Sequence, residues 1–125
     1  MKRYFACLAV LLTALLAACG ETVSPSIEGA AYIELQSGNT GELVTITDAD
    51  TVAQITADVN ALRLRDAQEI DSTGWSYRLR WYDADGAQLA ELLPHGWRVD
   101  WNGMRYQVAG THTVDTDLLD DLLGA

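Results

Sequence analysis

The chain has 125 residues, and its 18 acidic against 8 basic side chains give a formal net charge of −10. A surface this acidic is repelled by nucleic-acid phosphates and by anionic lipid head groups, which argues against nucleic acid as a partner. Hydrophobic residues make up 49% of the chain, so it is long and apolar enough for one domain with a single core.

The first 18 residues are typical of an export signal. Lys2 and Arg3 precede an apolar run from Phe5 to Ala18 that only Thr13 interrupts. As a helix, this run would span roughly 21 Å, which is short of a bilayer core near 30 Å. We therefore expect residues 1–18 to be a signal peptide and not a permanent transmembrane helix.

The segment ends in Leu16-Ala17-Ala18-Cys19-Gly20, which resembles the lipobox of bacterial lipoproteins. In these proteins a peptidase cuts before the cysteine, and the cysteine carries a diacylglycerol. The resemblance implies lipidation of Cys19, and two acyl chains give stable anchoring to a membrane. We expect a lipid-anchored protein on the extracytoplasmic side of a cell membrane. The alternative is an ordinary signal peptide that contains a cysteine.

Cleavage before Cys19 leaves 107 residues with six arginines, no lysine and a net charge of −12. Cys7 leaves with the signal and Cys19 carries lipid, so no disulfide is available to the mature domain. Residues 19–30 contain GETVSPSIEGA, which is small, polar and proline-containing, and we expect a flexible tether there. Residues 31–125 are expected to form one domain.

Residues 31–47 predict a hairpin, because alternating AYIEL and the β-branched run ELVTIT flank the turn-forming SGNTG. A helix is expected next, with Asp48 as its N-cap. Its apolar face is Val52, Ile55, Val59 and Leu62. The Asp48 and Asp50 pair is also compatible with a metal site, but carboxylates are favoured electrostatically at a helix N-terminus.

From residue 66 the chain reads as consecutive strands, the first of them the weak strand RDAQEID. GWSYRLRWY alternates strongly and AQLAELL follows it. One face of the alternation holds Trp75, Tyr77, Leu79 and Trp81. The other face holds Ser76, Arg78, Arg80 and Tyr82.

Asp83-Ala84-Asp85-Gly86 joins two of these strands and has the composition of a calcium loop. An EF-hand loop needs glycine at position 6 and glutamate at position 12. Starting at Asp83 puts Pro94 at position 12, and aligning Gly86 to position 6 puts Leu92 there. We therefore predict a type I turn closed by a left-handed glycine.

The segment WRVDW-NG-MRYQV, residues 97–108, predicts a hairpin with a two-residue type I′ turn at Asn102-Gly103. This register opposes Trp101 to Met104 and Asp100 to Arg105. At the C-terminus, VDTDLLDDLL predicts a helix capped by Asp115. The whole pattern indicates an α+β domain, an antiparallel sheet built mainly from hairpins with both helices covering one face.

Residues able to support catalysis are few. The only histidines, His95 and His112, belong to no recognised metal motif, and paired carboxylates are expected by chance among 18 acids. We predict no enzyme activity, no cofactor and no metal. The tryptophans Trp75, Trp81, Trp97 and Trp101 share parity with apolar strand positions, so we expect all four in the core and not in a sugar-stacking platform.

From Gly74 onward, the pattern GWSYRLRWYDADGAQL followed by NGMRYQV resembles small bacterial lipoproteins that carry a domain of unknown function. The resemblance implies a cell-envelope module and no catalytic residues. We expect a non-catalytic interaction module that binds an envelope protein or component. One alternative is a small-ligand or glycan-binding lipoprotein using exposed tryptophans, and another is a hydrolase with an unrecognised carboxylate site.

If the alternation holds, one polar sheet face carries Arg78, Arg80, Arg98 and Arg105. The planar fork of arginine suits carboxylate and phosphate groups, so this face is a candidate partner-binding surface. The favoured alternative is that Asp100 and neighbouring glutamates neutralise the arginines in cross-strand pairs.

Overall fold

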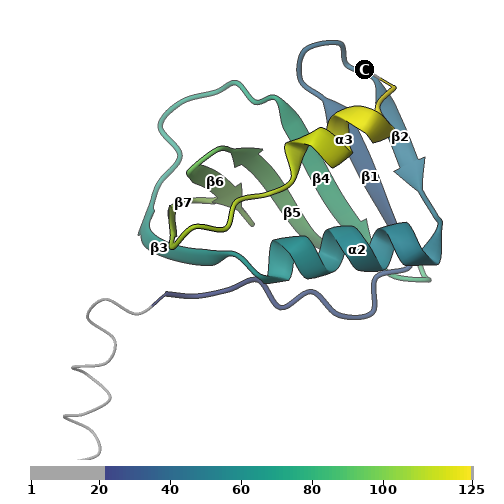
Figure 1. Cartoon of the computed structure of the whole chain (residues 1–125), viewed down its shortest axis with the longest axis horizontal. Helices are drawn as coiled ribbons and strands as arrows, with labels where there is room; N and C mark the ends of the chain where they lie inside the picture. The colour runs from purple at the N-terminus through teal and green to yellow at the C-terminus, as the bar shows by residue number, and fades with distance from the viewer. Residues whose placement is uncertain (1–21, 125) are drawn as a thin grey trace, which may run out of the picture.

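The alternating segments of the sequence pair into one antiparallel sheet (Figure 1). The computed structural model describes residues 22–124, so the expected signal peptide and Cys19 lie outside the described residues. Seven strands and two helices occupy this range, which confirms the predicted α+β class. The bounds in chain order are β1 Tyr32–Ser37, β2 Leu43–Ile46, α2 Ala49–Asn60, β3 Arg63–Gln68, β4 Tyr77–Tyr82, β5 Gln88–His95, β6 Arg98–Trp101, β7 Met104–Ala109 and α3 Thr116–Leu122.

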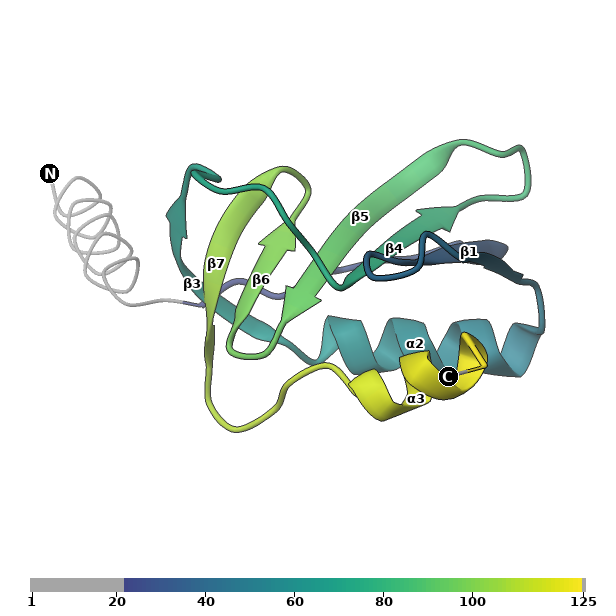
Figure 2. The ribbon, with the colours of Figure 1, turned by 90° about the horizontal axis from the view of Figure 1, so that it is seen from above.

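The strands lie in the order β2-β1-β4-β5-β6-β7-β3, so the two strands that flank α2 in sequence are at opposite edges of the sheet. α2 crosses one face between these edges, and α3 lies on the same face (Figures 1 and 2). We call this side the inner face and the opposite side the outer face. Neither helix in residues 22–124 is long and apolar enough to cross a bilayer.

The third strand differs from the prediction, because β3 spans Arg63–Gln68 and not RDAQEID, residues 65–71. Leu64 is its buried residue and opposes Val108 on β7. Asp66 has a positive φ of 56°, and the register shifts between Arg65 and Gln68. The irregular backbone interrupts the alternation here, which explains why the sequence signal is weak.

The core lies between the helices and the inner face. All four predicted helix positions are buried there: Val52, Ile55, Val59 and Leu62. The strands contribute the fully buried Leu79, Trp81, Leu92 and Val99. Trp81 also donates from Nε1 to Thr56 Oγ1 on α2 at 3.1 Å, which satisfies the buried indole N–H.

Both helices begin at their predicted caps. The Asp48 carboxylate accepts from the Thr51 N–H at 3.0 Å, and Asp115 accepts from the Leu118 N–H at 3.2 Å. These bonds satisfy N–H groups that have no partner inside a helix. The Asp48 carboxylate therefore serves the fold of α2.

α3 is held on the inner face by one apolar and one polar contact. Leu119 is buried in the core, and the Tyr77 hydroxyl on β4 donates to the Asp120 carboxylate. This hydrogen bond raises the pKa of Tyr77 to about 12, because the carboxylate stabilises the protonated phenol.

The two predicted turns are confirmed. Asn102 and Gly103 have φ of 48° and 86°, and β6 and β7 pair in the predicted register. In the other turn, Asp83 accepts from the N–H groups of Asp85 and Ala87 at 2.9 Å, and Gly86 has φ of 84°. The Asp83 carboxylate thus closes its own turn.

The expected flexible tether is wrong for the described part of residues 19–30. Val23 forms a backbone bridge with Leu64, on the edge of β3 that faces away from β7, with N···O distances of 2.8 and 2.7 Å. Ile27 is 7% exposed, and its backbone N–H and C=O bond the Asn60 side chain at the end of α2. Composition indicated a linker, but one buried isoleucine and an open strand edge bind the segment to the domain.

Replacing Gly103 tests the turn. Gly103→Val forces a β-branched residue into positive φ, and we expect a loss of at least about 1 kcal/mol in the free energy of unfolding. An added Cβ meets no atom within 4 Å, so the loss reports backbone conformation and not a clash. Gly103→Asn is the matched control, since asparagine tolerates positive φ. Equal stability of both variants and the parent, measured by urea unfolding, would contradict the turn assignment.

Candidate functional site

The outer face is covered in part by the link between Gln68 and Tyr77. The link must return from β3 at the edge to β4 near the centre, four strand spacings or about 19 Å away. The helices occupy the inner face, so the link crosses the outer face over β7, β6 and β5 (Figure 2). The predicted arginines point to this outer face, and the link decides which of them reach solvent.

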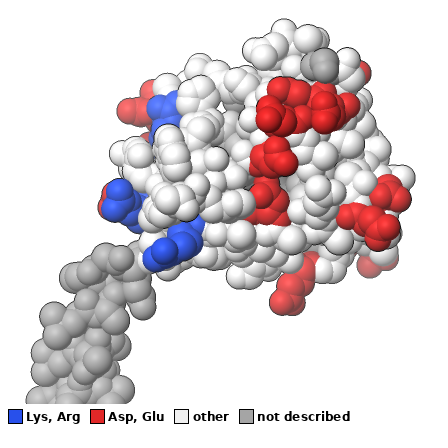
Figure 3. All heavy atoms as spheres, viewed as in Figure 1, with Lys and Arg blue, Asp and Glu red and all other residues white. Residues whose placement is uncertain are grey.

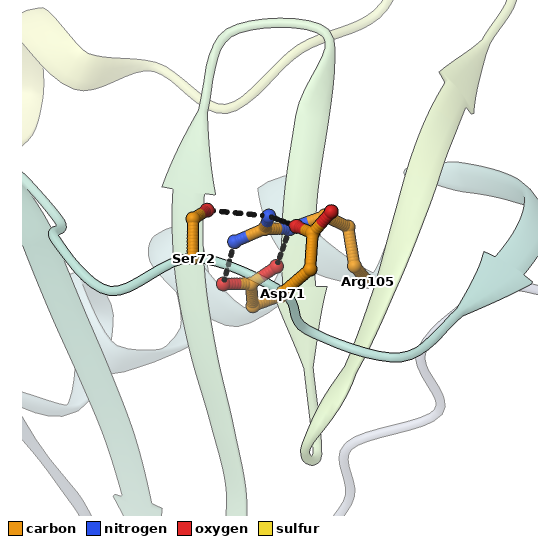
Figure 4. Close-up of polar contacts among 4 residues, drawn as sticks. Asp71, Ser72 and Arg105 are labelled. Atoms are coloured by element: carbon orange, nitrogen blue, oxygen red, sulfur yellow. Dashed lines mark hydrogen bonds and ion pairs between the residues drawn. The ribbon is translucent and has the colours of Figure 1, made fainter.

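Arg105 on β7 is buried at 3% exposure, which corrects the expectation that it belongs to an open basic face. Its guanidinium donates to both carboxylate oxygens of Asp100 on β6, at 2.8 and 3.1 Å. It also donates to Asp71 at 3.0 Å and to Ser72 at 2.8 Å, both on the link (Figure 4). The hydrogen bonds to Asp100 raise the pKa of Arg105. Arg105 therefore fastens the link to the sheet.

Two more of the predicted arginines are engaged within the fold. Arg80 on β4 donates to Glu91 on β5 at 2.7 Å, and this hydrogen bond raises the pKa of Arg80. Arg78 lies 4.2 Å from the centre of the Trp75 ring, in a cation–π contact. Its Nε is buried and has no hydrogen-bond partner among the described residues. The cross-strand neutralisation by acids is therefore present for Arg80 and Arg105, whereas an aromatic ring covers Arg78.

Trp75 corrects the predicted alternation, because it lies over the outer face with Arg78 and not on the inner face with Trp81. β4 begins only at Tyr77, so Trp75 belongs to the link and strand parity does not apply to it. The link is also packed against the first hairpin. A Cβ added to Gly38 would lie 1.8 Å from the Trp75 carbonyl oxygen, so only glycine fits at this approach.

A pocket of about 220 Å³ lies between the link and the sheet. Its apolar lining comes from Ile70, Trp75 and Leu93, and its carboxylates are Glu91 and Asp100. Both carboxylates already accept hydrogen bonds from arginine. The pocket is smaller than most ligand sites, which run from about 300 to 1,000 Å³.

The tryptophans have four different environments, which corrects the expectation that all are in the core. Trp81 is completely buried, and Trp101 is half-buried against the core. Trp75 covers Arg78, and Trp97 is 56% exposed in the turn just before β6. They form no common stacking surface within the described residues.

Arg98, the fourth predicted arginine, lies apart from the network around Arg105. Its strand register aligns it with Gln107 on β7 and, one strand further, with Arg65 on β3. Arg63 shares the outer-facing parity of Arg65, and both are exposed. Neither was singled out from the sequence, because the long-range pairing of β3 with β7 is invisible in local alternation.

The histidines do not form a metal cluster. His112 contacts Asp58 at the end of α2, with its Nε2 3.1 Å from the carboxylate, while His95 ends β5 in an exposed position. Across residues 22–124 there is no group of three or more His, Cys, Asp or Glu side chains placed to hold a metal ion.

Comparison with protein-family models, with curated proteins and with solved structures finds no significant match to the chain. The resemblance to small bacterial lipoproteins therefore stays a prediction from the sequence.

The role of Arg105 is testable by replacing it with a side chain of similar size. Arg105→Met leaves the Asp100 carboxylate, 13% exposed, without its bidentate partner, so we expect a clear fall in the urea midpoint of unfolding. Asp71→Asn is the control, because Asp71 is 88% exposed and its ion pair contributes little. If both variants lose the same stability, the bidentate pair of Arg105 with Asp100 is not the main contribution of Arg105 to the fold.

Proposed function

We propose that the protein is a lipid-anchored, extracytoplasmic module of a bacterial cell envelope that binds an envelope protein or component without catalysing a reaction. The lipobox at Cys19 supports the anchor, and the basic and apolar signal before it supports export. No part of this proposal depends on a cofactor.

The observation that carries the proposal is the attachment of Val23 to β3. Val23 is four positions after Cys19, so their Cα atoms are at most about 14 Å apart. With Val23 bonded to Leu64, a lipid on Cys19 would hold the folded domain against the membrane surface. The domain would not explore the wide volume that a long flexible tether allows.

The engaged charges give no support to the hydrolase alternative, which needs carboxylates that are free to act on a substrate. Two carboxylates line the outer-face pocket, and both bond arginines: Glu91 bonds Arg80, and Asp100 bonds Arg105. These pairs hold neighbouring strands together, and Arg105 also bonds the link. The separate environments of the tryptophans give no support to the glycan-binding alternative, which needs a shared aromatic platform.

The anchor is tested by exchanging each cysteine of the precursor. We expect Cys19→Ser to abolish labelling by radioactive palmitate and to leave an uncleaved precursor, because the thiol is the acceptor of the diacylglycerol. Cys7→Ser is the matched control, since Cys7 lies within the apolar run and should be labelled and cleaved as the parent is. Normal labelling and cleavage of Cys19→Ser would contradict the lipoprotein assignment.

A further inference from the structure

Three arginines lie together at one end of the sheet, outside the network around Arg105. Arg63 and Arg65 are on β3, and Arg65 aligns through Gln107 with Arg98 on β6. Two strand spacings put the Cα atoms of Arg65 and Arg98 about 10 Å apart. We call Arg63, Arg65 and Arg98 the basic end.

The basic end has little internal neutralisation. Arg65 has a loose pair with Asp66 at 3.7 Å, in which both side chains are more than half exposed, and such pairs contribute little. Arg63 and Arg98 have no carboxylate partner among residues 22–124. Figure 3 shows the visible arginine atoms gathered over β3, β6 and β7, and most of the visible acidic atoms over the rest of the domain.

Only part of the acidic surface is far enough away to be screened, because Asp66 on β3 and Glu69 and Asp71 on the link are exposed close to the basic end. β2 and β3 are opposite edges of a seven-stranded sheet, and six spacings span about 29 Å. The Debye length is about 10 Å at 0.1 M salt. At this end an anionic surface meets the three arginines together with these carboxylates, and Arg63 and Arg98 have no ion-pair partner within residues 22–124. The mature chain as a whole carries −12. In other orientations of the domain, its net negative charge is expected to repel an anionic membrane.

Two exposed apolar side chains lie at the same end. Trp97 and Val23 are 56% and 54% exposed. They are the two ends of one row across the strands, in which Val108 bonds Trp97 and Leu64 bonds Val23. Val108 and Leu64 point to the inner face, whereas the arginines of the basic end have the outer-facing parity, so a surface that holds both sets must be the end of the sheet and not one of its faces. Tryptophan is enriched at membrane–water interfaces, where its ring and its N–H suit the head-group layer.

We propose that this end of the sheet is a docking face for anionic phospholipid head groups, with the arginines on phosphates and Trp97 in the interfacial layer. The inference rests on the proposed lipid anchor, which would place Cys19 within about 14 Å of Val23 and so bring this same end to the membrane. The two acyl chains already give stable anchoring, and basic residues near an anionic surface add an attraction that would orient the domain on it. The bulk of the acidic surface then points away from the bilayer.

The test uses the processed full-length lipoprotein reconstituted into vesicles of phosphatidylcholine, with or without 30 mol% phosphatidylglycerol. Flotation with either vesicle reports the anchor, and quenching of tryptophan fluorescence by brominated phospholipids reports docking. We expect quenching only with phosphatidylglycerol at 0.1 M salt, and its loss in Trp97→Phe and at 0.5 M salt.

The triple variant Arg63→Gln, Arg65→Gln, Arg98→Gln should lower the docking equilibrium roughly 100-fold, or about five-fold for each arginine. The control Asp117→Asn, Asp121→Asn changes exposed charges on α3 and should leave quenching unchanged. If the protein floats with both vesicles but phosphatidylglycerol causes no quenching, the docking face is overturned and the lipid anchor stands. If the protein fails to float with neutral vesicles, the lipid anchor is contradicted. In that case the docking face is judged separately, by whether anionic vesicles quench the tryptophan fluorescence.

Discussion

The pairing of β3 with β7 is the constraint on which the rest of the structure depends. It places β3 at the edge opposite β2, so that α2 must cross the inner face and the link 69–76 must return across the outer face. The helix crossing creates the core around Trp81, and the link crossing covers Arg105 and Arg78. The free edge of β3 is the place where Val23 adds its two backbone hydrogen bonds.

Local features of the sequence predicted the fold well. Helical spacing from Val52 to Leu62, the capping aspartates and Asn102-Gly103 each depend on residues near one another in the chain, and the structure confirms them. The prediction for Trp75 was wrong because the strand alternation was extended to two residues before Tyr77, where β4 begins.

The site was harder to predict, since its geometry comes from contacts distant in sequence. The shared face of the four arginines follows from alternation, and the β6–β7 register correctly gave the pair of Arg105 with Asp100. The burial of Arg105 depends on Asp71 and Ser72, which lie more than 30 residues away along the chain. In the same way, the neighbours of Arg98 become visible only when β3 is paired with β7. Composition also gave a wrong prediction for residues 22–30, which it indicated to be a flexible linker. The single apolar residue Ile27 is buried in the core and holds the segment against the domain.

The account of function depends on the N-terminal segment being part of the fold, since only then does an anchor on Cys19 select one end of the domain. The most direct measurement is amide hydrogen exchange of Leu64 in the processed protein. Its N–H points away from β7 and donates to the Val23 carbonyl, whereas alternate residues of β3 pair inward with β7. We predict that the Leu64 amide is protected to a degree similar to that of its neighbour Arg65. Free exchange at Leu64 with protection at Arg65 would show that the segment is detached and would contradict the account.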